Sequence, residues 1–323
     1  MKSYAAFYEK ARLQSSSGGV FSLIASKFDV IYGVAMTEDC YGCEFVRIEK
    51  DINSLRGSKY FQAKMGDTLK KIKQDLLDGR NVLFSGTGCQ INGLCSFLGK
   101  EYNNLFLLEI ICHGVPSPLL WKEYVKFQES RFGKIKSVNF RCKEINTNGN
   151  GRKIKSIFIS KDEDAFMRMF LNNYCLRPSC YECFAKKNKL SDITIADFWG
   201  IDKIAPEMDD GKGISLMIIR TSKGDKLFEQ IKDELNYKEV NPKLSIAENP
   251  SEFKSVERPL QRDFFYEDFR IMTFKKLANK YVYGKLWRRI ARRVKRTIKA
   301  VFLSSSKKIN QFNYGILIYT ENK

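Results

Sequence analysis

The chain has 323 residues, 43% apolar and 13% aromatic, with 56 Lys and Arg against 37 Asp and Glu, a formal charge of +19. This length corresponds to about two domains, and the composition excludes disordered, collagen-like and low-complexity chains. The excess positive charge leaves nucleic acid, an anionic membrane and an acidic small molecule as partner classes.

The apolar pattern predicts strands interleaved with helices, which is typical of an α/β fold and also compatible with a mixed α+β fold, with a sheet flanked by helices. Residues 1–13 lack the features of a secretory signal, and no apolar run reaches the ~18 residues of a membrane span. We therefore expect a cytoplasmic protein. Strands are expected at Val30–Met36, Glu44–Ile48, 81–87, Leu105–Cys112, Ile154–Ser160, Asp192–Ala196 and Ile214–Arg220, and helices at 20–28, Asp67–Leu77, 88–98, Leu119–Arg131 and Gly224–Leu235.

Four cysteines lie at predicted strand ends or in loops. Cys89 follows one strand in a glycine turn, Cys112 ends the next strand, and Cys180 and Cys183 form a C-x-x-C pair. In a cytoplasmic protein such thiols are metal ligands, catalytic groups or core residues more often than disulfides. The pair can bind one metal ion or cluster, and the other two thiolates would complete its set of four ligands. Two alternatives stay open: Cys89 and Cys112 as buried apolar residues, or a plain zinc site.

The other cysteines and the single histidine carry weaker signals. Cys40 and Cys43 form a second C-x-x-C in an expected hairpin turn, where such pairs also occur without function. His113 follows Cys112 directly, so a structural role and an active-site role are both open. The remaining cysteines are expected to be packing residues: Cys95, Cys142 and Cys175.

Two polar segments are candidates for binding a phosphate or a nucleotide. The loop Ser15–Gly19 opens a predicted helix, where free N–H groups and the helix end attract anions. It matches neither a Walker loop nor the G-x-G-x-x-G fingerprint, and a plain helix cap explains it equally well. The segment Arg56–Tyr60 offers two cations, a hydroxyl and an aromatic ring, or else forms a solvated turn.

Six motifs occur in an order typical of one family. They are Ser-Ser-Gly-Gly-Val-Phe-Ser (16–22), Arg-Gly-Ser-Lys-Tyr (56–60), Phe-Ser-Gly-Thr-Gly-Cys-Gln (84–90), Ile-Cys-His-Gly-Val-Pro-Ser-Pro (111–118), Arg-Pro-Ser-Cys-Tyr-Glu-Cys (177–183) and Ser-Asp-Ile-Thr-Ile-Ala-Asp-Phe-Trp-Gly (191–200). From about Ser15 to about Pro250 the chain resembles the coenzyme F420 hydrogenase/dehydrogenase beta-subunit family of iron–sulfur flavoproteins.

The resemblance implies an oxidoreductase that passes electrons between a [4Fe–4S] cluster, FAD and an organic acceptor, either a deazaflavin like coenzyme F420 or a surface-polysaccharide precursor. It implies that the cluster ligands are Cys89, Cys112, Cys180 and Cys183. The residues that it places at the flavin are Ser16, Ser17, Gly18, Gly19, Arg56, Gly57, Ser58, Lys59, Tyr60 and Thr87. His113 and Asp197 are the candidates for proton delivery, although Asp197 equally suits a turn cap.

The sequence departs from the family pattern in two ways. The ferredoxin-like module that many relatives carry ahead of the first motif has no counterpart, so we expect an external ferredoxin-like electron donor. Gly88 stands where relatives usually have Pro, which predicts a softer turn around Cys89.

The C-terminal part holds most of the positive charge. Residues 271–323 contain fourteen Lys or Arg and one acid, and residues 285–302 place apolar side chains at helical spacing between cations. This pattern predicts a basic amphipathic helix that attaches the protein peripherally to the inner face of an anionic membrane. A partner protein and a solvated tail are alternatives, and nucleic acid is disfavoured because no nucleic-acid-binding motif occurs.

The predicted organisation has three parts: a flavin-contacting part (1–84), a cysteine part of the same catalytic unit (85–262) and a basic tail (263–323). A different class of function also fits these parts. In it, Cys180 and Cys183 hold structural zinc in a non-catalytic protein whose basic tail binds a membrane or a partner.

Overall fold

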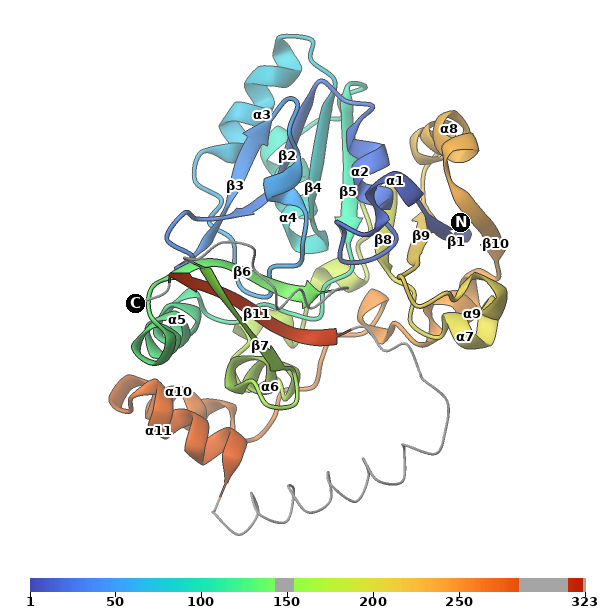
Figure 1. Cartoon of the computed structure of the whole chain (residues 1–323). Coiled ribbons are helices and arrows are strands. Elements are labelled where there is room, and N and C mark those ends of the chain that lie inside the picture. Colours follow the sequence, from blue (N-terminus) through green and yellow to red (C-terminus); the bar gives the residue numbers. More distant parts are fainter. Residues whose placement is uncertain (143–153, 285–312, 322–323) are drawn as a thin grey trace.

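A large mixed sheet dominates the computed structural model, which describes residues 1–142, 154–284 and 313–321 (Figure 1). The four strands β2, β4, β5 and β8 run parallel, and antiparallel strands extend the sheet on both sides. The order across the sheet is β10 (Asn236–Val240), β1 (Lys2–Phe7), β9 (Ser215–Ile219), β8 (Ile193–Asp197), β5 (Leu105–Ile110), β4 (Val82–Thr87), β2 (Val30–Met36) and β3 (Cys43–Ile48).

Helices cover both faces of this sheet. They are needed there because successive apolar side chains of β4 point to opposite faces. Val82 and Phe84 pack with α3 and α4 on one face, whereas Leu83 packs with α2 and α8 on the other. The helices are α1 (Glu9–Arg12), α2 (Val20–Ala25), α3 (Thr68–Leu77), α4 (Gly88–Leu98), α5 (Pro118–Phe132), α6 (Ala165–Leu171), α7 (Ile201–Ile204), α8 (Ser222–Ile231), α9 (Pro242–Ala247), α10 (Arg262–Ile271) and α11 (Phe274–Ala278). The predicted fold, a sheet flanked by helices, is confirmed.

Short helical turns connect these elements. They are η1 (Asn53–Leu55), η2 (Pro178–Cys180), η3 (Phe184–Lys186), η4 (Pro206–Met208), η5 (Lys232–Glu234), η6 (Pro250–Glu252) and the π-helical turn η7 (Asn279–Tyr283). No helix in the described ranges is long and apolar enough to cross a membrane.

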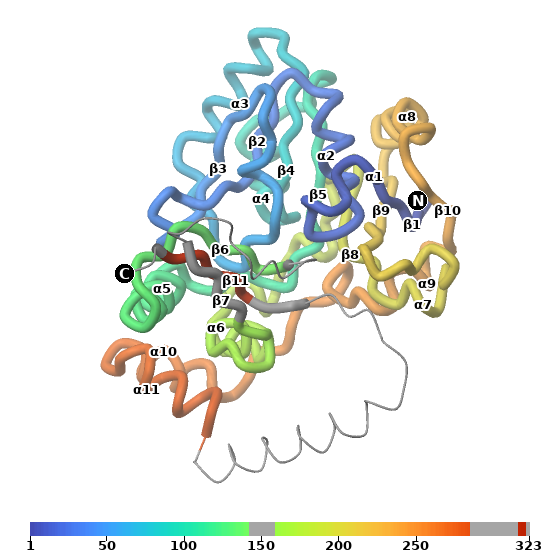
Figure 2. The backbone as a smooth tube through the Cα atoms, viewed as in Figure 1, coloured from blue at the N-terminus to red at the C-terminus, as the bar shows by residue number. Residues whose placement is uncertain are grey.

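A second, three-stranded sheet joins distant parts of the chain. Its central strand is β11 (Asn313–Glu321), which pairs antiparallel with β6 (Ile135–Cys142) and with β7 (Ile154–Ser160). Figure 2 lets the reader follow the chain from the C-terminal end back between these two strands. Part of the predicted basic tail is therefore a strand of the folded unit.

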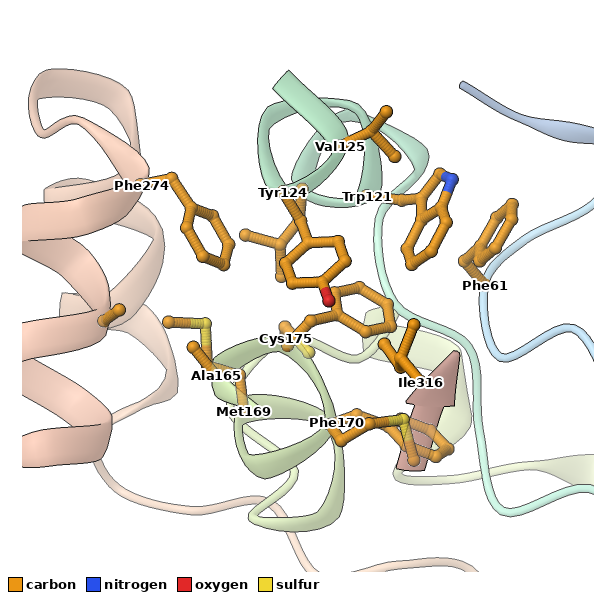
Figure 3. Packing of buried hydrophobic residues seen from close by; sticks show 14 of the residues in the cluster. Phe61, Trp121, Tyr124, Val125, Ala165, Met169, Phe170, Cys175, Phe274 and Ile316 are labelled. Atoms are coloured by element: carbon orange, nitrogen blue, oxygen red, sulfur yellow. The ribbon is translucent and has the colours of Figure 1, made fainter. Parts of the chain in front are cut away.

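An aromatic core lies beneath the second sheet. Trp121 and Tyr124 of α5 pack with Phe166 of α6 and Phe274 of α11, and Ile316 of β11 closes the cluster (Figure 3). The core also includes Ile135 and Phe140, so it fixes β6 relative to α5. The predicted amphipathic helix at 285–302 lies outside the described residues.

Candidate functional site

The predicted cysteine turns lie at the carboxyl edge of the parallel strands, where α/β sheets commonly hold their ligands. β4 ends at Thr87, α4 begins at Gly88, and the exposed Cys89 stands in its first turn. The Thr87 hydroxyl lies 3.3 Å from the sulfur of Cys89, and the Thr87 N–H donates to the Gln90 side chain at 2.8 Å. β5 ends at Ile110, so Cys112 emerges at the same edge.

The loop that carries Cys180 and Cys183 packs against both of these turns. The Arg177 N–H donates to the Val115 carbonyl at 2.9 Å, and a Cβ placed on Gly114 would lie 3.4 Å from the Cβ of Cys180. On the other side, a Cβ placed on Gly88 would lie 3.1 Å from the Cβ of Ala185 in η3. Three segments distant in sequence therefore meet here.

The four thiols, which we call the cysteine quartet (Cys89, Cys112, Cys180 and Cys183), share one electrostatic environment. Burial raises the pKa of Cys112 to about 12; Lys186 acts in the opposite direction, and Cys180 and Cys89 add to the increase. Burial also raises the pKa of Cys180, with smaller contributions from Cys89 and Cys183. Lys186 donates from Nζ to the carbonyls of Cys112 and Ser251, which places a cation at the centre of these loops.

The donor chemistry of the quartet fits an iron–sulfur cluster. All four cysteines are free thiols, and thiolates are the ligands that such clusters use. Within residues 1–142, 154–284 and 313–321, no three His, Cys, Asp or Glu side chains converge closely enough to hold one metal ion. In a cubane cluster each thiolate binds a different iron atom, so its ligands stand farther apart than those of a single ion.

The two predicted phosphate-binding segments also come together. The Ser16 hydroxyl accepts from the Ser58 N–H at 3.0 Å and lies 3.2 Å from the Ser58 hydroxyl, and Arg56 Nε donates to the Ser22 hydroxyl at 3.1 Å. Gly18 lets the loop that carries Ser16 pack closely against β1, because a Cβ there would lie 2.5 Å from the Ala6 carbonyl oxygen.

Lys59 stabilises the turn that presents Ser58. Its ammonium donates to the carbonyls of Ser54, Leu55 and Arg56 at 3.1, 3.1 and 2.8 Å. These three bonds use all the donors of a lysine. Burial lowers the pKa of Lys59 to about 8. Gly57, in the same turn, adopts φ +81, which favours glycine.

Tyr60 links this turn to the second sheet. Arg141 of β6 forms an ion pair with Asp197 at the end of β8, and both side chains are largely buried. Burial raises the pKa of Tyr60, while Arg141 and a hydrogen bond with Ser58 oppose the increase. The Tyr60 ring packs edge-on against Phe140 at 5.2 Å. Asp197 therefore lies beside a predicted flavin-contacting residue.

An aromatic path joins this region to the quartet. The Phe170 ring is 5.4 Å from that of Tyr60 and 5.1 Å from that of His113, the residue after Cys112. His113 Nε2 lies 2.7 Å from Asn173 Oδ1, and burial lowers the histidine pKa. The residues predicted from separate motifs therefore form one continuous region.

The second C-x-x-C pair differs from the quartet. Cys40 and Cys43 are buried in the β2–β3 turn, and burial raises the pKa of both thiols, that of Cys43 to about 12. The Cys40 carbonyl accepts from Trp121 Nε1 at 2.9 Å, and Cys40 itself adopts φ +59. These contacts belong to the aromatic core.

Several residues of this region gave no recognisable signal in the sequence. Arg141 stands in a strand without a motif, and its partner Asp197 belongs to the other sheet. Phe170 and Asn173 lie in and after α6, whose apolar residues predict only a buried helix. Lys186 belongs to no motif, although it stands three residues after Cys183.

Two comparisons with known proteins found a similarity, one to a family and one to a solved structure. The family model that describes the C-terminal region of the coenzyme F420 hydrogenase/dehydrogenase beta subunit matches residues 79–243, just over half of the chain. A chain from the F420-reducing [NiFe] hydrogenase complex of Methanosarcina barkeri, in a xenon-derivatised structure, has a similar fold. Its TM-score is 0.50 at 15% identity, with 84% of this chain and 92% of that chain covered.

No curated protein matches the sequence. The resemblance based on the six motifs is nevertheless confirmed by the family match. The chain belongs to the coenzyme F420 hydrogenase/dehydrogenase beta-subunit family and is an oxidoreductase of that broad type.

Proposed function

We propose that this chain passes electrons between a [4Fe–4S] cluster held by the cysteine quartet, an FAD and a small organic acceptor. The observation that supports the proposal is that the three distant segments carrying these four free thiols contact one another at one edge of the sheet, through Arg177 and Val115, Gly88 and Ala185, and Lys186 and the Cys112 carbonyl. When bound, the cluster supplies electrons singly, and the flavin exchanges them in pairs with the acceptor.

At the quartet, this chain provides ligands and a compensating charge. Cys112 is half-buried, and the Lys186 ammonium lies near enough to oppose the rise in the pKa of that thiol. A positive charge beside several thiolates offsets their mutual repulsion, and charges near a cluster tune its reduction potential. Thr87 supplies a hydroxyl beside the sulfur of Cys89.

At the other end, the Ser16–Ser58 contact and Arg56 would hold the flavin phosphates and ribityl chain. Hydroxyls, backbone N–H groups and a guanidinium are the donors that phosphate oxygens prefer. Ser17 and Gly18 fasten this loop to β9 through the Ile214 carbonyl at 2.8 Å and the Ser215 hydroxyl at 3.0 Å. Lys59 acts as a positioning residue, since its donors are committed to the turn.

His113 is the proton carrier in this proposal. Asn173 donates from Nδ2 to the Glu257 carbonyl at 3.4 Å, so its Oδ1 faces Nε2 of His113. The histidine then donates through Nε2 and keeps Nδ1 as an acceptor. Asp197 is the second candidate for proton delivery, and its ion pair with Arg141 holds that guanidinium beside Tyr60.

The acceptor and the partners follow from the family and from the charge distribution. The matched hydrogenase complex is named for reducing F420, so a deazaflavin is the first acceptor to test, with a surface-polysaccharide precursor as the second. We propose an external ferredoxin-like protein as electron donor. We also propose that residues 285–302 attach the protein peripherally to an anionic membrane at its cytoplasmic face.

The experiment is anaerobic purification followed by measurement of iron, zinc and flavin in the full chain. We expect brown-yellow protein that releases iron and FAD on denaturation. Colourless protein with stoichiometric zinc would contradict the proposal and favour a non-catalytic, zinc-stabilised protein. Iron without flavin would show that the chain keeps the cluster but does not couple it to two-electron chemistry.

A further inference from the structure

Two carboxylates and two cations form a buried network near the cysteine loops, which we call the buried ion network (Glu109, Lys189, Glu252 and Arg220). Lys189 Nζ lies 2.8 Å from Glu109 Oε1 and 3.2 Å from Glu252 Oε2. Arg220 forms an ion pair with the other carboxylate oxygen of Glu252. No more than 16% of any of these four side chains is exposed. The two positive and two negative charges balance, which burial of ionic groups requires.

Two hydroxyls from the start of the motif at 191–200 complete the network. The Ser191 hydroxyl donates to Glu109 Oε2 at 2.9 Å, and the Thr194 hydroxyl lies 3.3 Å from the same oxygen. Arg220 Nε donates to the Thr194 hydroxyl at 2.6 Å. Both oxygens of Glu109 therefore have partners, so its carboxylate is fixed in one orientation. The start of this motif has a partner that the proposed function does not yet use.

The network reaches all three segments that carry the quartet. Glu109 belongs to β5 and stands three residues before Cys112. Its Oε1 would lie 2.8 Å from a Cβ placed on Gly88, the residue before Cys89. Lys189 follows the C-x-x-C pair after six residues, with η3 between them. Lys189 therefore ties the C-x-x-C loop, through one carboxylate, to the segments of the other two cysteines.

Glu252 adds a contact on the other side of the C-x-x-C loop. Three residues after Glu252, the Ser255 hydroxyl accepts from the Cys183 N–H at 2.9 Å. Lys186 donates to the carbonyl of the residue before Glu252, and Lys189 pairs with Glu252 itself. The C-x-x-C loop is thus held between β5 and η6, and Lys189 is bonded to a carboxylate on each side.

We propose that Lys189 is the positioning residue of the cysteine quartet. It holds the C-x-x-C loop against the turns of Cys89 and Cys112, so that the four sulfur atoms keep one arrangement before a cluster binds. This inference rests on the cluster proposed above. Residues that orient metal ligands from outside commonly change metal affinity by about 10- to 100-fold when they are replaced. Loss of Lys189 should therefore weaken retention of the cluster by more than its effect on folding explains.

The test measures iron release from anaerobically purified full-length holoprotein to the chelator bathophenanthroline disulfonate, with urea unfolding of each protein in parallel. Lys189→Met removes the tie and leaves two buried carboxylates with one cation. Glu109→Gln/Lys189→Met also removes the tie but keeps the charges balanced, because Glu252 retains Arg220. Lys189→Arg keeps a cation at this position. The matched control is Lys187→Met, which removes an exposed lysine from the same loop.

We expect both variants without the tie to release iron about tenfold or more faster than the wild type, whereas Lys189→Arg and Lys187→Met release it at nearly the wild-type rate. The charge-balanced variant should do so although its stability is closer to that of the wild type than the stability of Lys189→Met is. If the charge-balanced variant releases iron at the wild-type rate, the network only stabilises the fold, and the positioning proposal is wrong while the cluster stands. If the wild type holds no iron, both proposals are wrong.

Discussion

The Ser16 hydroxyl accepts a hydrogen bond from the Ser58 N–H at 3.0 Å across 42 residues of sequence. This contact joins the loop before α2 to the turn after η1, and both segments carry residues that the proposed flavin site needs. Ser16 is the shared acceptor, because the Ser58 hydroxyl lies 3.2 Å from the same oxygen.

Replacing Ser16 should therefore weaken flavin binding. Ser16→Ala removes the acceptor of both contacts, and one hydrogen bond contributes about 1 kcal/mol, so the FAD dissociation constant should rise about five- to tenfold. Fluorescence titration of flavin-free protein measures this change. Ser26→Ala is the control, because that hydroxyl donates to the Leu23 carbonyl near the end of α2, away from the proposed flavin site. Equal affinities in the two variants would argue against a flavin at this contact.

Gly88 should tolerate no side chain, although relatives usually have Pro there. A Cβ at this position would lie 2.8 Å from Glu109 Oε1, and that carboxylate is buried and bonded to Lys189 at 2.8 Å and to Ser191 at 2.9 Å. We expect Gly88→Ala to lower the free energy of unfolding by about 1–3 kcal/mol through overpacking.

The control for this substitution lies on the same helix. Gly93 of α4 has no atom within 4 Å of a would-be Cβ, so Gly93→Ala should raise the free energy of unfolding by about 0.5–1 kcal/mol through helix propensity. Urea unfolding of both variants and of the wild type measures these changes in the free energy of unfolding. A Gly88→Ala protein as stable as the wild type would mean that Glu109 moves away without cost.

Arg141 should matter for both stability and flavin binding. Its ion pair with Asp197 has only 9% and 22% of the two side chains exposed, and breaking a buried pair costs about 3–5 kcal/mol. Arg141→Gln should lower the free energy of unfolding by an amount approaching that range and reduce the FAD content of the purified protein. The exposed Arg131 of α5 provides the control Arg131→Gln, for which we expect wild-type values. Unchanged stability and flavin content in Arg141→Gln would show that Arg141 of β6 does not contribute to the flavin site.

Asp164 should make stability fall as the pH rises from about 4 to about 6. Burial raises the pKa of Asp164 to about 6, whereas the unfolded chain titrates near 3.8. Between these values the folded protein keeps a proton that the unfolded chain has lost, so deprotonation favours unfolding, by up to ~3 kcal/mol above pH 6.

The measurement is the difference in unfolding free energy between Asp164→Asn and the wild type, followed by urea titration at several pH values. The asparagine keeps an acceptor for the Met167 N–H, which Asp164 binds at 2.8 Å. The difference should shift in favour of the variant as the pH rises through this window. A difference that does not depend on pH would show that folding leaves the pKa of Asp164 unchanged.

The sequence predicted those parts of the fold whose pattern is local. β2 and β7 have the predicted bounds, and β4 was recognisable because Val82, Leu83 and Phe84 form a buried run before a glycine turn. β1 was not predicted: its neighbours β9 and β10 come some two hundred residues later, and its own residues resemble a charged, aromatic N-terminus. β11 was missed for the same reason, as its apolar residues lie within a basic tail and pair with β6 and β7.

The site shows the same division. Cys89, Ser16 and Ser58 stand in short sequence motifs, so their candidate roles could be predicted from neighbouring residues in the sequence alone. The role of Arg141 could not be predicted from the sequence, because its ion pair with Asp197 forms only where β6 of the second sheet meets the end of β8. Gly88 required the position of Glu109 before its small size could be explained.

The central claim, that the cysteine quartet holds an iron–sulfur cluster, is tested most directly by two serine substitutions on one helix. Cys89 is an exposed member of the quartet at the start of α4, and Cys95 lies six residues later, packed against the core formed with α3. We predict that anaerobically purified Cys89→Ser loses most of its iron while Cys95→Ser keeps the wild-type content. Equal iron content in the two variants would contradict the claim.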